Sequence, residues 1–274
     1  MPAPDERRWR TTAIQEEVRA LLDNNTWEVV DVPPAGTNIA GIRWVFARKH
    51  EGRYKAWLVV KWFTQQYGVD YFETYAGVVR SETIRACMAV AAIEGWLFII
   101  FDIKNAYLTA PIKEDVYIKP PEGVDIPGLT AGQVLQLLRA LYGTKQAARA
   151  FAVLLAQVLL RRLGFIPTLS DPCLYYRPAS DGHGPALVHS HVDDGVIYGS
   201  DESCIITELL QELHKLLPLI KYVHDDLLGC VVQRRSTHKI LIHQRPMLED
   251  IVRTCGTQQH LNPVATPMAK DAAS

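Results

Sequence analysis

The spacing of apolar and polar positions along the chain predicts most of its helices and strands. Helices are expected where apolar residues recur at near-helical spacing, over residues 5–24, 81–96, 146–163, 201–217 and 245–256. Strands are expected where short runs are rich in β-branched and aromatic residues, within residues 27–36, 42–50, 53–63, 96–102, 186–192, 195–199, 219–224, 227–234 and 239–243. Ser81 is the predicted N-cap of its helix, and Gly95 is the predicted stop.

From residue 96 onward the expected elements follow the order β-α-β-β-α-β, which is typical of a ferredoxin-like split sheet. The buried strand ends at Asp102, and the hairpin over 186–199 carries the adjacent acids Asp193 and Asp194. Asp194-Gly195 is a dipeptide of the kind that closes two-residue hairpins, so we expect the turn there. The pattern therefore predicts an α+β fold in which the Asp102 strand lies beside this hairpin, in the middle of one antiparallel sheet.

The converging acids predict a metal site. Three clustered carboxylates repel one another unless cations neutralise them. Oxygen ligands of this kind suit magnesium or manganese rather than zinc, and two such ions about 4 Å apart clamp the attacking and leaving oxygens of a phosphoryl transfer. The simpler alternative is a hydrated turn, which is the usual meaning of an Asp-Asp pair. We assign a second pair, Asp225 and Asp226, to such a turn because no strand-end acid accompanies it.

Composition limits the class of protein without deciding it. The chain has 274 residues, of which 48% are hydrophobic and 22% charged, so it is long enough for a large core or for two lobes. Its net charge of −1 provides no overall positive field for nucleic acid, although local basic clusters bind phosphates in neutral proteins as well. The five cysteines form no CxxC pair, which favours a reducing compartment over disulfides or a zinc knuckle.

Membrane and secretory segments are not expected. The N-terminus lacks the apolar core of a signal peptide, and the longest apolar run, residues 96–101, is too short to span a bilayer. We therefore expect a soluble intracellular protein without a membrane partner.

Several motifs together resemble one known family. The segment "FDIKNAYL" at 101–108 resembles the first catalytic motif of reverse transcriptases, and "HVDD" at 191–194 resembles their second aspartate motif. From Trp27 to about Met268 the chain resembles the reverse transcriptase region of copia-type LTR retrotransposon polyproteins, through segments such as "NNTWEVVDVP", "DVYIKPPEGV", "LYGTKQAARAF" and "NPVATPM". Single motifs are weak evidence, whereas their order and spacing are specific.

The resemblance implies a fold and a division of the chain. The fold is a right-hand polymerase palm, built on the β-α-β-β-α-β sheet, with fingers and a partial thumb. Residues 1–95 would hold the N-terminal helix and the fingers strands. Residues 96–225 would form the palm with its catalytic motifs and an inserted fingers segment. Residues 226–274 would form a partial thumb or connection and a C-terminal linker.

The resemblance also implies a role for individual residues. Asp102, Asp193 and Asp194 match the catalytic triad that binds two Mg²⁺ (or Mn²⁺) ions. Tyr107 matches the steric gate that lies under the incoming sugar and rejects a 2′-hydroxyl; an aromatic core residue is the alternative. Gln146 matches the residue beside the incoming nucleotide and its template base.

Three lysines are further candidates for nucleotide contacts. Lys55 and Lys61 lie on the strand that resembles the triphosphate-contacting strand of the family, and solvated strand edges are the alternative for both. Lys145 faces either phosphate or solvent. His189, His191 and Asp193 alternate along one strand, so a His-x-His-x-Asp metal site is a further alternative, which the family motif makes unnecessary.

The implied activity is RNA-directed DNA polymerisation, in which a primer 3′-hydroxyl attacks the α-phosphate of a deoxynucleoside triphosphate. The implied partners are an RNA or DNA template–primer, deoxynucleoside triphosphates, and the integrase and ribonuclease H regions of the same polyprotein. The expected location is the cytoplasm, virus-like particles included, with the nucleus as the alternative.

Departures from the family pattern support a rival interpretation. Trp57 stands where the family has arginine, Trp62 where it has glycine, and His191 where it has a tyrosine that supports the primer end. The rival is a decayed or co-opted palm and fingers fragment that is catalytically weak or inactive and only binds nucleic acid.

Overall fold

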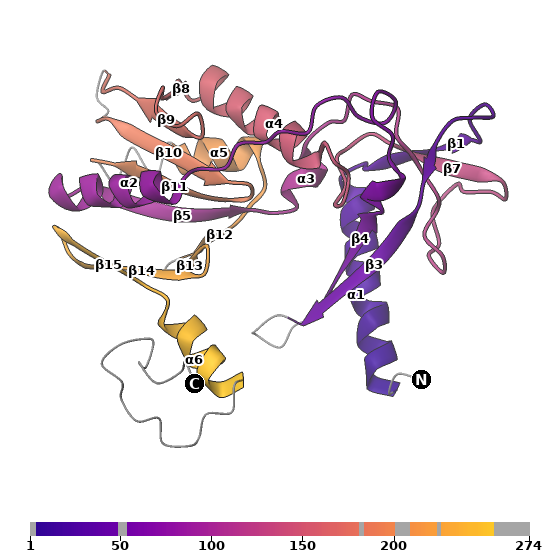
Figure 1. Ribbon diagram of the computed structural model, residues 1–274, viewed down its shortest axis with the longest axis horizontal. Helices are drawn as coiled ribbons and strands as arrows, with labels where there is room; N and C mark the ends of the chain where they lie inside the picture. Colours follow the sequence, from indigo (N-terminus) through magenta and orange to yellow (C-terminus); the bar gives the residue numbers. More distant parts are fainter. Residues whose placement is uncertain (1–3, 49–53, 181–183, 201–208, 224–225, 255–274) are drawn as a thin grey trace, which may run out of the picture.

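The computed structural model describes residues 4–48, 54–180, 184–200, 209–223 and 226–254. One end of the molecule holds a six-stranded sheet with helices against it, and the other end holds the N-terminal helix with two smaller sheets (Figure 1). A three-stranded sheet and the last helix lie below the six-stranded sheet in this view. No helix in the described ranges is both long enough and apolar enough to cross a bilayer.

The six-stranded sheet has the predicted topology. Its strands are β5 (Leu97–Ile103), β8 (Ile166–Pro167), β9 (Leu174–Arg177), β10 (Ala186–His191), β11 (Asp194–Gly199) and β12 (Leu219–Val223). Helix α4 (Ala147–Arg161) comes between β5 and β10, and α5 (Gln211–Leu216) comes between β11 and β12. The spatial order is β12-β5-β11-β10-β9-β8, so β5 lies between β12 and the β10–β11 hairpin. This confirms the β-α-β-β-α-β order and the central position of the Asp102 strand.

Both faces of this sheet are buried, because successive side chains of a strand point to opposite faces. Phe101 of β5 shares one buried cluster with residues of α4 and α5. Its neighbour Ile100 shares another with Met88 and Ala91 of α2 (Ser81–Ile93). The sheet is therefore held between α2 on one side and α4 with α5 on the other (Figure 1). This double coverage explains why the β5 segment is a continuous apolar run.

The start of α2 differs from the prediction. Arg80 is its N-cap and Ser81 is already helical. The carboxylate of Asp171, a buried residue, accepts hydrogen bonds from the Arg80 N–H at 3.1 Å and from the Thr83 hydroxyl at 2.7 Å. An acid from a distant segment thus replaces the local serine cap. Gly95 follows the helix with φ +69°, which confirms it as the stop.

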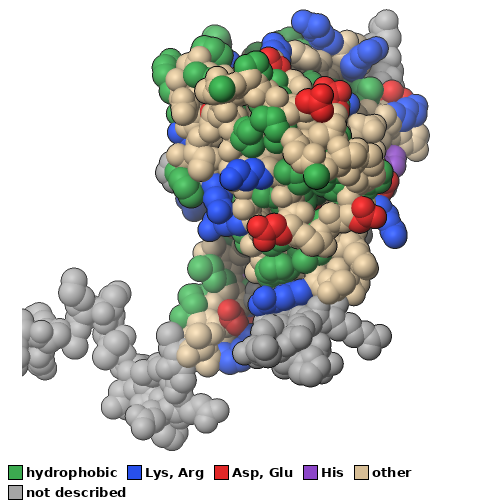
Figure 2. Space-filling view, turned by 90° about the vertical axis from the view of Figure 1, so that its right-hand side faces the viewer, with side chains coloured by type: hydrophobic (Ala, Val, Ile, Leu, Met, Phe, Trp, Pro, Cys, Tyr) green, Lys and Arg blue, Asp and Glu red, His purple; other side chains and the backbone are tan. Residues whose placement is uncertain are grey.

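The N-terminal end combines three parts of the chain. Helix α1 (Pro4–Asp23) packs along the hairpin of β3 (Ile42–Arg48) and β4 (Tyr54–Val60). The four-stranded sheet has the order β1-β7-β6-β2, with β1 (Trp27–Asp31), β2 (Ile39–Ala40), β6 (Tyr117–Ile118) and β7 (Gln133–Leu137). The segment between β5 and α4 therefore returns to pair with the N-terminal strands. Basic and acidic side chains are interspersed over the face of the molecule seen in Figure 2.

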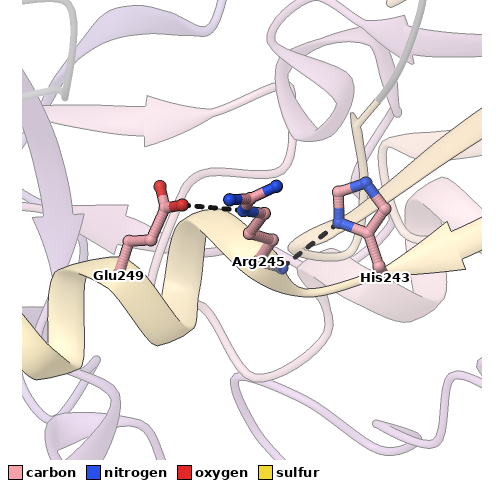
Figure 3. A network of polar contacts seen from close by, with 3 residues as sticks. All are labelled: His243, Arg245 and Glu249. Carbon is pink, nitrogen blue, oxygen red and sulfur yellow. Dashed lines mark hydrogen bonds and ion pairs between the residues drawn. The ribbon is translucent and has the colours of Figure 1, made fainter.

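The C-terminal part is small. Strands β13 (Asp226–Leu227), β14 (Cys230–Ser236) and β15 (Lys239–His243) precede α6 (Arg245–Thr254). The start of α6 is held locally: the Arg245 N–H donates to His243 Nδ1 at 3.3 Å, and Arg245 Nε donates to Glu249 at 2.9 Å (Figure 3). Asp226 lies in a strand paired with Val231, so its assignment to a turn was wrong; its neighbour Asp225 lies outside the described residues.

Other predictions also fall outside the described ranges. They are residues 49, 50 and 53 at the ends of two expected strands, residues 201–208 of the expected helix over 201–217, and the expected C-terminal linker.

Candidate active site

The structure brings the predicted acids to one end of two paired strands. Strand β11 pairs antiparallel with β5, and in this register Asp194 is the direct partner of Asp102. The backbone continues the pairing into the turn, because the Ile103 N–H donates to the Asp193 carbonyl at 3.0 Å. Like charges that face each other across two strands destabilise a sheet on their own. The register thus places two of the three predicted acids opposite each other at this end of the sheet.

The hairpin turn lies two residues before the Asp194-Gly195 dipeptide at which it was predicted. His191 pairs with Asp194, so the two turn residues are Val192 and Asp193. Val192 has φ +62°, a conformation that costs a β-branched residue free energy and that is often found at functional sites. Gly195 lies within β11, where a Cβ atom would stand 2.2 Å from the Phe101 ring. Glycine is thus needed here for close packing across the strands. The turn prediction was wrong because it took this glycine for a turn residue.

Tyr107 lies next to the acids. It belongs to the single turn α3 (Ala106–Thr109), which follows β5 after Asn105 at φ +52°. Its ring packs edge to face on Tyr142, with 5.2 Å between the ring centroids. Burial, and secondarily the nearby Asp193, raises the pKa of the Tyr107 phenol. A half-buried neutral aromatic beside Asp193 fits the predicted floor for a nucleotide sugar.

The loop that carries Tyr142 is docked on the edge of β4. The Val60 N–H donates to the Tyr142 carbonyl at 2.8 Å. Gly143 has φ +83°, and a Cβ atom there would stand 2.2 Å from the Val60 carbonyl oxygen. The loop therefore approaches β4 more closely than any other residue type allows.

Because the Tyr142 loop lies so close to β4, alanine substitution at two glycines should have unequal effects on stability. Gly143→Ala should destabilise the protein by about 1–3 kcal/mol more than Gly132→Ala, because overpacking against backbone costs about that much. Gly132 is the matched control: it has φ +87° and open space around its Cβ position, so both variants carry the same left-handed strain. Urea unfolding of both variants measures the difference. Equal destabilisation would show that the loop is not held against β4.

Gln146 is buried, and its amide is engaged with the 65–70 segment. Its Nε2 donates to the Asp70 carbonyl at 2.9 Å, and its Oε1 accepts from Gln65 Nε2 at 3.1 Å. It also lines a cavity of about 310 Å³ beside α4, with Arg149 and Phe72. Arg149 forms an ion pair with Glu73 at the same place. Gln146 thus ties the start of α4 to the segment after β4.

The three predicted lysines are not gathered at one point. Lys61 follows β4 directly, and its N–H donates to the Gly41 carbonyl at 2.8 Å. Lys145 Nζ donates to the Tyr71 hydroxyl at 2.7 Å, so the Lys145 side chain does not face solvent alone. Lys55 lies five residues before Val60, roughly 16 Å along an extended strand, with its Nζ 5.0 Å from the centroid of the Trp57 ring. Lys61 and Lys145 therefore flank the Tyr142 loop, whereas Lys55 lies farther along β4.

His189 is a core residue in this structure. It is buried, and its Nε2 is 2.8 Å from the Tyr198 hydroxyl. Burial lowers the pKa of His189 to about 4. Asp193 belongs to the turn, so it does not continue the alternation of His189 and His191 along β10. The arrangement assigns His189 to the packing of the sheet.

The buried pair of His189 and Tyr198 predicts a pH effect on stability. The unfolded chain takes up the imidazole proton near pH 6.5 and the folded chain only near pH 4. Folding stability from this group is therefore complete above pH 6.5 and is lost as the pH falls toward 4, by up to about 3 kcal/mol. The variant His189→Leu/Tyr198→Phe removes both partners and should lack this loss in urea titrations at pH 7 and pH 4.5. The variant His214→Asn, at an exposed histidine, is the control. If the double variant loses as much free energy of unfolding between pH 7 and pH 4.5 as the parent does, the assignment of His189 is contradicted.

Glu17 has the opposite effect on the pH dependence of stability, so the contributions of His189 and Glu17 must be separated by variants. Burial raises the pKa of this carboxyl from 4.5 to about 7, although the Leu58 N–H and then Lys55 oppose that shift. The folded chain holds the proton longer than the unfolded chain, so this contribution is complete below pH 4.5 and is lost as the pH rises toward 7. Glu17→Gln should gain up to about 3 kcal/mol relative to the parent between pH 4.5 and pH 8. If the stability of Glu17→Gln does not rise relative to the parent over this pH range, the carboxyl of Glu17 is solvated in the folded protein.

Sequence reasoning missed two residues of this region. Tyr142 carries no local signal, because its contact with Tyr107 joins two separate segments. Glu17 does carry one. It lies at helical spacing between Ala13 and Leu21, and all three side chains are buried, so it is a charged residue on an apolar stripe.

The acids have the right chemistry for divalent ions, but the described residues do not form a closed metal site. Carboxylate oxygens are the ligands that magnesium and manganese prefer. Among the residues that the structure describes, no group of three or more His, Cys, Asp or Glu side chains is arranged to hold a metal ion. Asp102 and Asp194 are paired and Asp193 is adjacent, so the donor set fits such ions while its side-chain geometry is incomplete.

An acid on the central strand and two more at the adjacent hairpin, on a β-α-β-β-α-β sheet, are the features of a polymerase palm. Comparison with known proteins agrees. Residues 24–270 match the family model described as reverse transcriptase (RNA-dependent DNA polymerase). The chain belongs to this reverse transcriptase family, whose members generally use divalent metal ions.

Several relatives are polyproteins of plant transposons. The chain is 35% identical to the retrovirus-related Pol polyprotein from transposon RE1 of Arabidopsis thaliana, over 96% of this chain and 18% of that protein. It is 34% identical to that of transposon RE2 of the same plant, over 96% and 18%. It is 31% identical to that of transposon TNT 1-94 of Nicotiana tabacum, over 94% and 19%. The chain thus spans less than a fifth of the length of these relatives.

Proposed function

We propose that this chain is the RNA-directed DNA polymerase region of a copia-type retrotransposon polyprotein, and that it adds deoxynucleotides to a primer 3′-hydroxyl. The register that makes Asp194 the partner of Asp102, with Asp193 in the turn beside them, is the observation that carries the proposal. Reverse transcriptase ancestry alone would be compatible with a chain that has lost its acids. This chain retains all three.

Each residue of the site would have its own role in the reaction. Asp102, Asp193 and Asp194 would hold two Mg²⁺ or Mn²⁺ ions. When bound, such ions activate the primer hydroxyl and neutralise the leaving pyrophosphate. Tyr107 would lie under the sugar of the incoming nucleotide, supported by Tyr142. Lys61 and Lys145 would meet its phosphates.

Gln146 takes a supporting role in this proposal. Its amide already bonds to Gln65 and to the Asp70 backbone. It would therefore fix the 65–70 segment beside the templating base. Lys55 would approach phosphate only from the far part of β4.

The larger arrangement follows from the same proposal. Residues 96–225 would be the palm, residues 1–95 with the returning segment before α4 would be fingers, and residues 226–274 would begin a thumb or connection. The partners would be an RNA or DNA template–primer, deoxynucleoside triphosphates, and the integrase and ribonuclease H regions of the same polyprotein. The place of action would be the cytoplasm, virus-like particles included, or the nucleus.

Primer extension on poly(rA)/oligo(dT) with magnesium or manganese tests this function. The proposal expects extension, with salt-sensitive binding of the template–primer because phosphate contacts dominate affinity. Binding without extension, in the presence of both metals, would favour the rival.

The rival function is a decayed copy that binds nucleic acid without efficient catalysis. Trp57 favours it: the family has an arginine there, and here Lys55 lies over the indole ring instead. The triple reversion Trp57→Arg, Trp62→Gly and His191→Tyr separates the two. A large fall in the apparent KM for nucleotide would support decay, and an unchanged KM in an active parent would show that these residues are tolerated.

A further inference from the structure

The two faces of the β3–β4 hairpin differ in burial. Successive side chains of a strand point to opposite faces, so each face carries its own row of cross-strand pairs. On one face Ala56, Leu58 and Val60 of β4 are at most 1% exposed. On the same face the Arg10 guanidinium of α1 lies 4.9 Å from the centroid of the Phe46 ring. Helix α1 therefore covers this face of the hairpin, along which it runs in Figure 1.

The opposite face carries what we call the outer row. The register of the hairpin gives this row three cross-strand pairs, which are Arg43 with Val59, Val45 with Trp57, and Ala47 with Lys55. None of these six side chains is buried: Arg43 is exposed, and the other five are half-buried. The outer row thus combines two cations, an indole ring and three small apolar side chains, and it contains no acid.

The outer row starts beside the proposed nucleotide site. The Tyr142 loop lies over its first pair, because a Cβ atom at Gly143 would stand 2.5 Å from Val59 Cγ1. Lys55, at the other end of the row, is four residues from Val59, roughly 13 Å along an extended strand. Trp57 lies midway between them. The row therefore extends away from the site along β4, with the indole ring at its centre.

The side chains of the outer row suit a nucleic acid strand. Lys55 Nζ lies 5.0 Å from the centroid of the Trp57 ring, within the range of a cation–π contact. Proteins that bind single strands without sequence preference combine positive charge along the backbone with aromatic rings on which bases stack. Two cations with no acid on the same row favour a polyanion over an apolar peptide as the occupant.

We propose that the outer row binds single-stranded nucleic acid, with an unpaired base stacked on Trp57 and the neighbouring phosphates on Lys55 and Arg43. In a polymerase this strand is the template ahead of the active site, and that assignment rests on the proposed function. Binding itself does not require catalysis. The inference gives Trp57 a use in this chain, whereas the decayed-copy interpretation counts it only as the loss of an arginine.

Three variants isolate the indole ring of the outer row. Trp57→Leu removes the aromatic surface, and Trp57→Phe keeps a smaller one. Trp44→Leu is the matched control, because Trp44 belongs to the same hairpin but pairs with Leu58 on the face toward α1. A loss that depends on the outer row should appear in Trp57→Leu and not in Trp44→Leu.

The first readout is binding of the full chain to two template–primers, measured by fluorescence anisotropy without nucleotide. One carries a single-stranded extension of the template, and the other is a blunt duplex of the same paired length. The parent should prefer the extended substrate. Trp57→Leu should weaken binding to that substrate by about five- to a hundredfold, the usual cost of one lost base stack, and leave the blunt duplex unchanged. A parent without this preference, or an equal preference in Trp57→Leu, would overturn the proposal.

The salt dependence tests the two cations independently of the ring. Lys55→Gln and Arg43→Gln should each lower the slope of log affinity against log salt by about 0.7 on the extended substrate, the value for one phosphate contact in a single strand. Arg161→Gln, at an exposed arginine at the end of α4, is the control and should leave the slope unchanged. Unchanged slopes in both variants would overturn the proposal, including the case in which Trp57→Leu does not fold.

Primer extension separates the template from the incoming nucleotide as the occupant. With saturating template–primer, Trp57→Leu should keep an apparent KM for deoxynucleotide close to that of the parent. A raised KM together with unchanged binding of the extended substrate would place the incoming nucleotide on Trp57 and overturn the proposal. A chain that binds the extension through Trp57 and extends no primer would refute the proposed function and not the binding surface.

Discussion

Replacing Asp193 by asparagine is expected to lower primer extension by at least about a hundredfold to a thousandfold, the usual cost of removing one group that stabilises developing charge. The side chain keeps its size, so the hairpin and its bond from Ile103 to the Asp193 carbonyl should remain. The loss should appear in kcat rather than in the affinity for template–primer. Single-turnover extension with excess enzyme measures it directly.

The same variant should not destabilise the protein. Without metal, three neighbouring carboxylates repel one another, and asparagine removes one of these charges. Thermal melts in chelator should therefore give an equal or higher Tm than the parent. Asp125→Asn, at an exposed acid between β6 and β7, is the matched control and should change neither quantity. If Asp193→Asn extends primers like the parent, Asp193 is only a turn residue.

Replacing Tyr107 by valine is expected to relax sugar selection by roughly ten- to a hundredfold. The ring fills the space that a 2′-hydroxyl would need, and overpacking costs about 1–3 kcal/mol in close-packed sites. Tyr107 is half-buried against Tyr142, so the ring has little freedom to move aside. The ratio of kcat/KM for deoxyribonucleotides over ribonucleotides on one template measures the effect.

Tyr107→Phe is the control for this experiment. It keeps the ring and loses only the hydroxyl, so it should retain most of the selectivity. Unchanged selectivity in Tyr107→Val would make Tyr107 a packing residue. Loss of selectivity in Tyr107→Phe would mean that the hydroxyl, rather than the bulk of the ring, discriminates.

The placement of Asp102 beside the hairpin could be predicted from sequence because it depends on local patterns. The apolar run before Asp102 predicts a buried strand, and the apolar runs on both sides of Asp193 and Asp194 predict a hairpin. The β-α-β-β-α-β order then allows few arrangements, and the observed pairing of Asp102 with Asp194 follows. The family resemblance supplied the chemistry of these positions.

Contacts between distant segments could not be predicted in the same way. Gly195 is a glycine because Phe101 lies against it across the strands, which no local rule on turns can reveal. The cap of α2 comes from Asp171, far along the chain. The bonds of the Gln146 amide to Gln65 and to the Asp70 carbonyl likewise join distant segments, and no local pattern indicates them. Each case depends on tertiary packing, which overrides local preference.

The central claim is that Asp102, Asp193 and Asp194 together hold the catalytic ions, and manganese binding tests it most directly. The free Mn²⁺ signal in electron paramagnetic resonance would be followed during titration of the full chain with a chain-terminated template–primer and the next deoxynucleoside triphosphate. The account predicts about two bound ions per complex for the parent, as in two-metal sites, and fewer for Asp102→Asn and Asp193→Asn at equal nucleic-acid occupancy. Equal numbers of ions in the parent and both variants would contradict it.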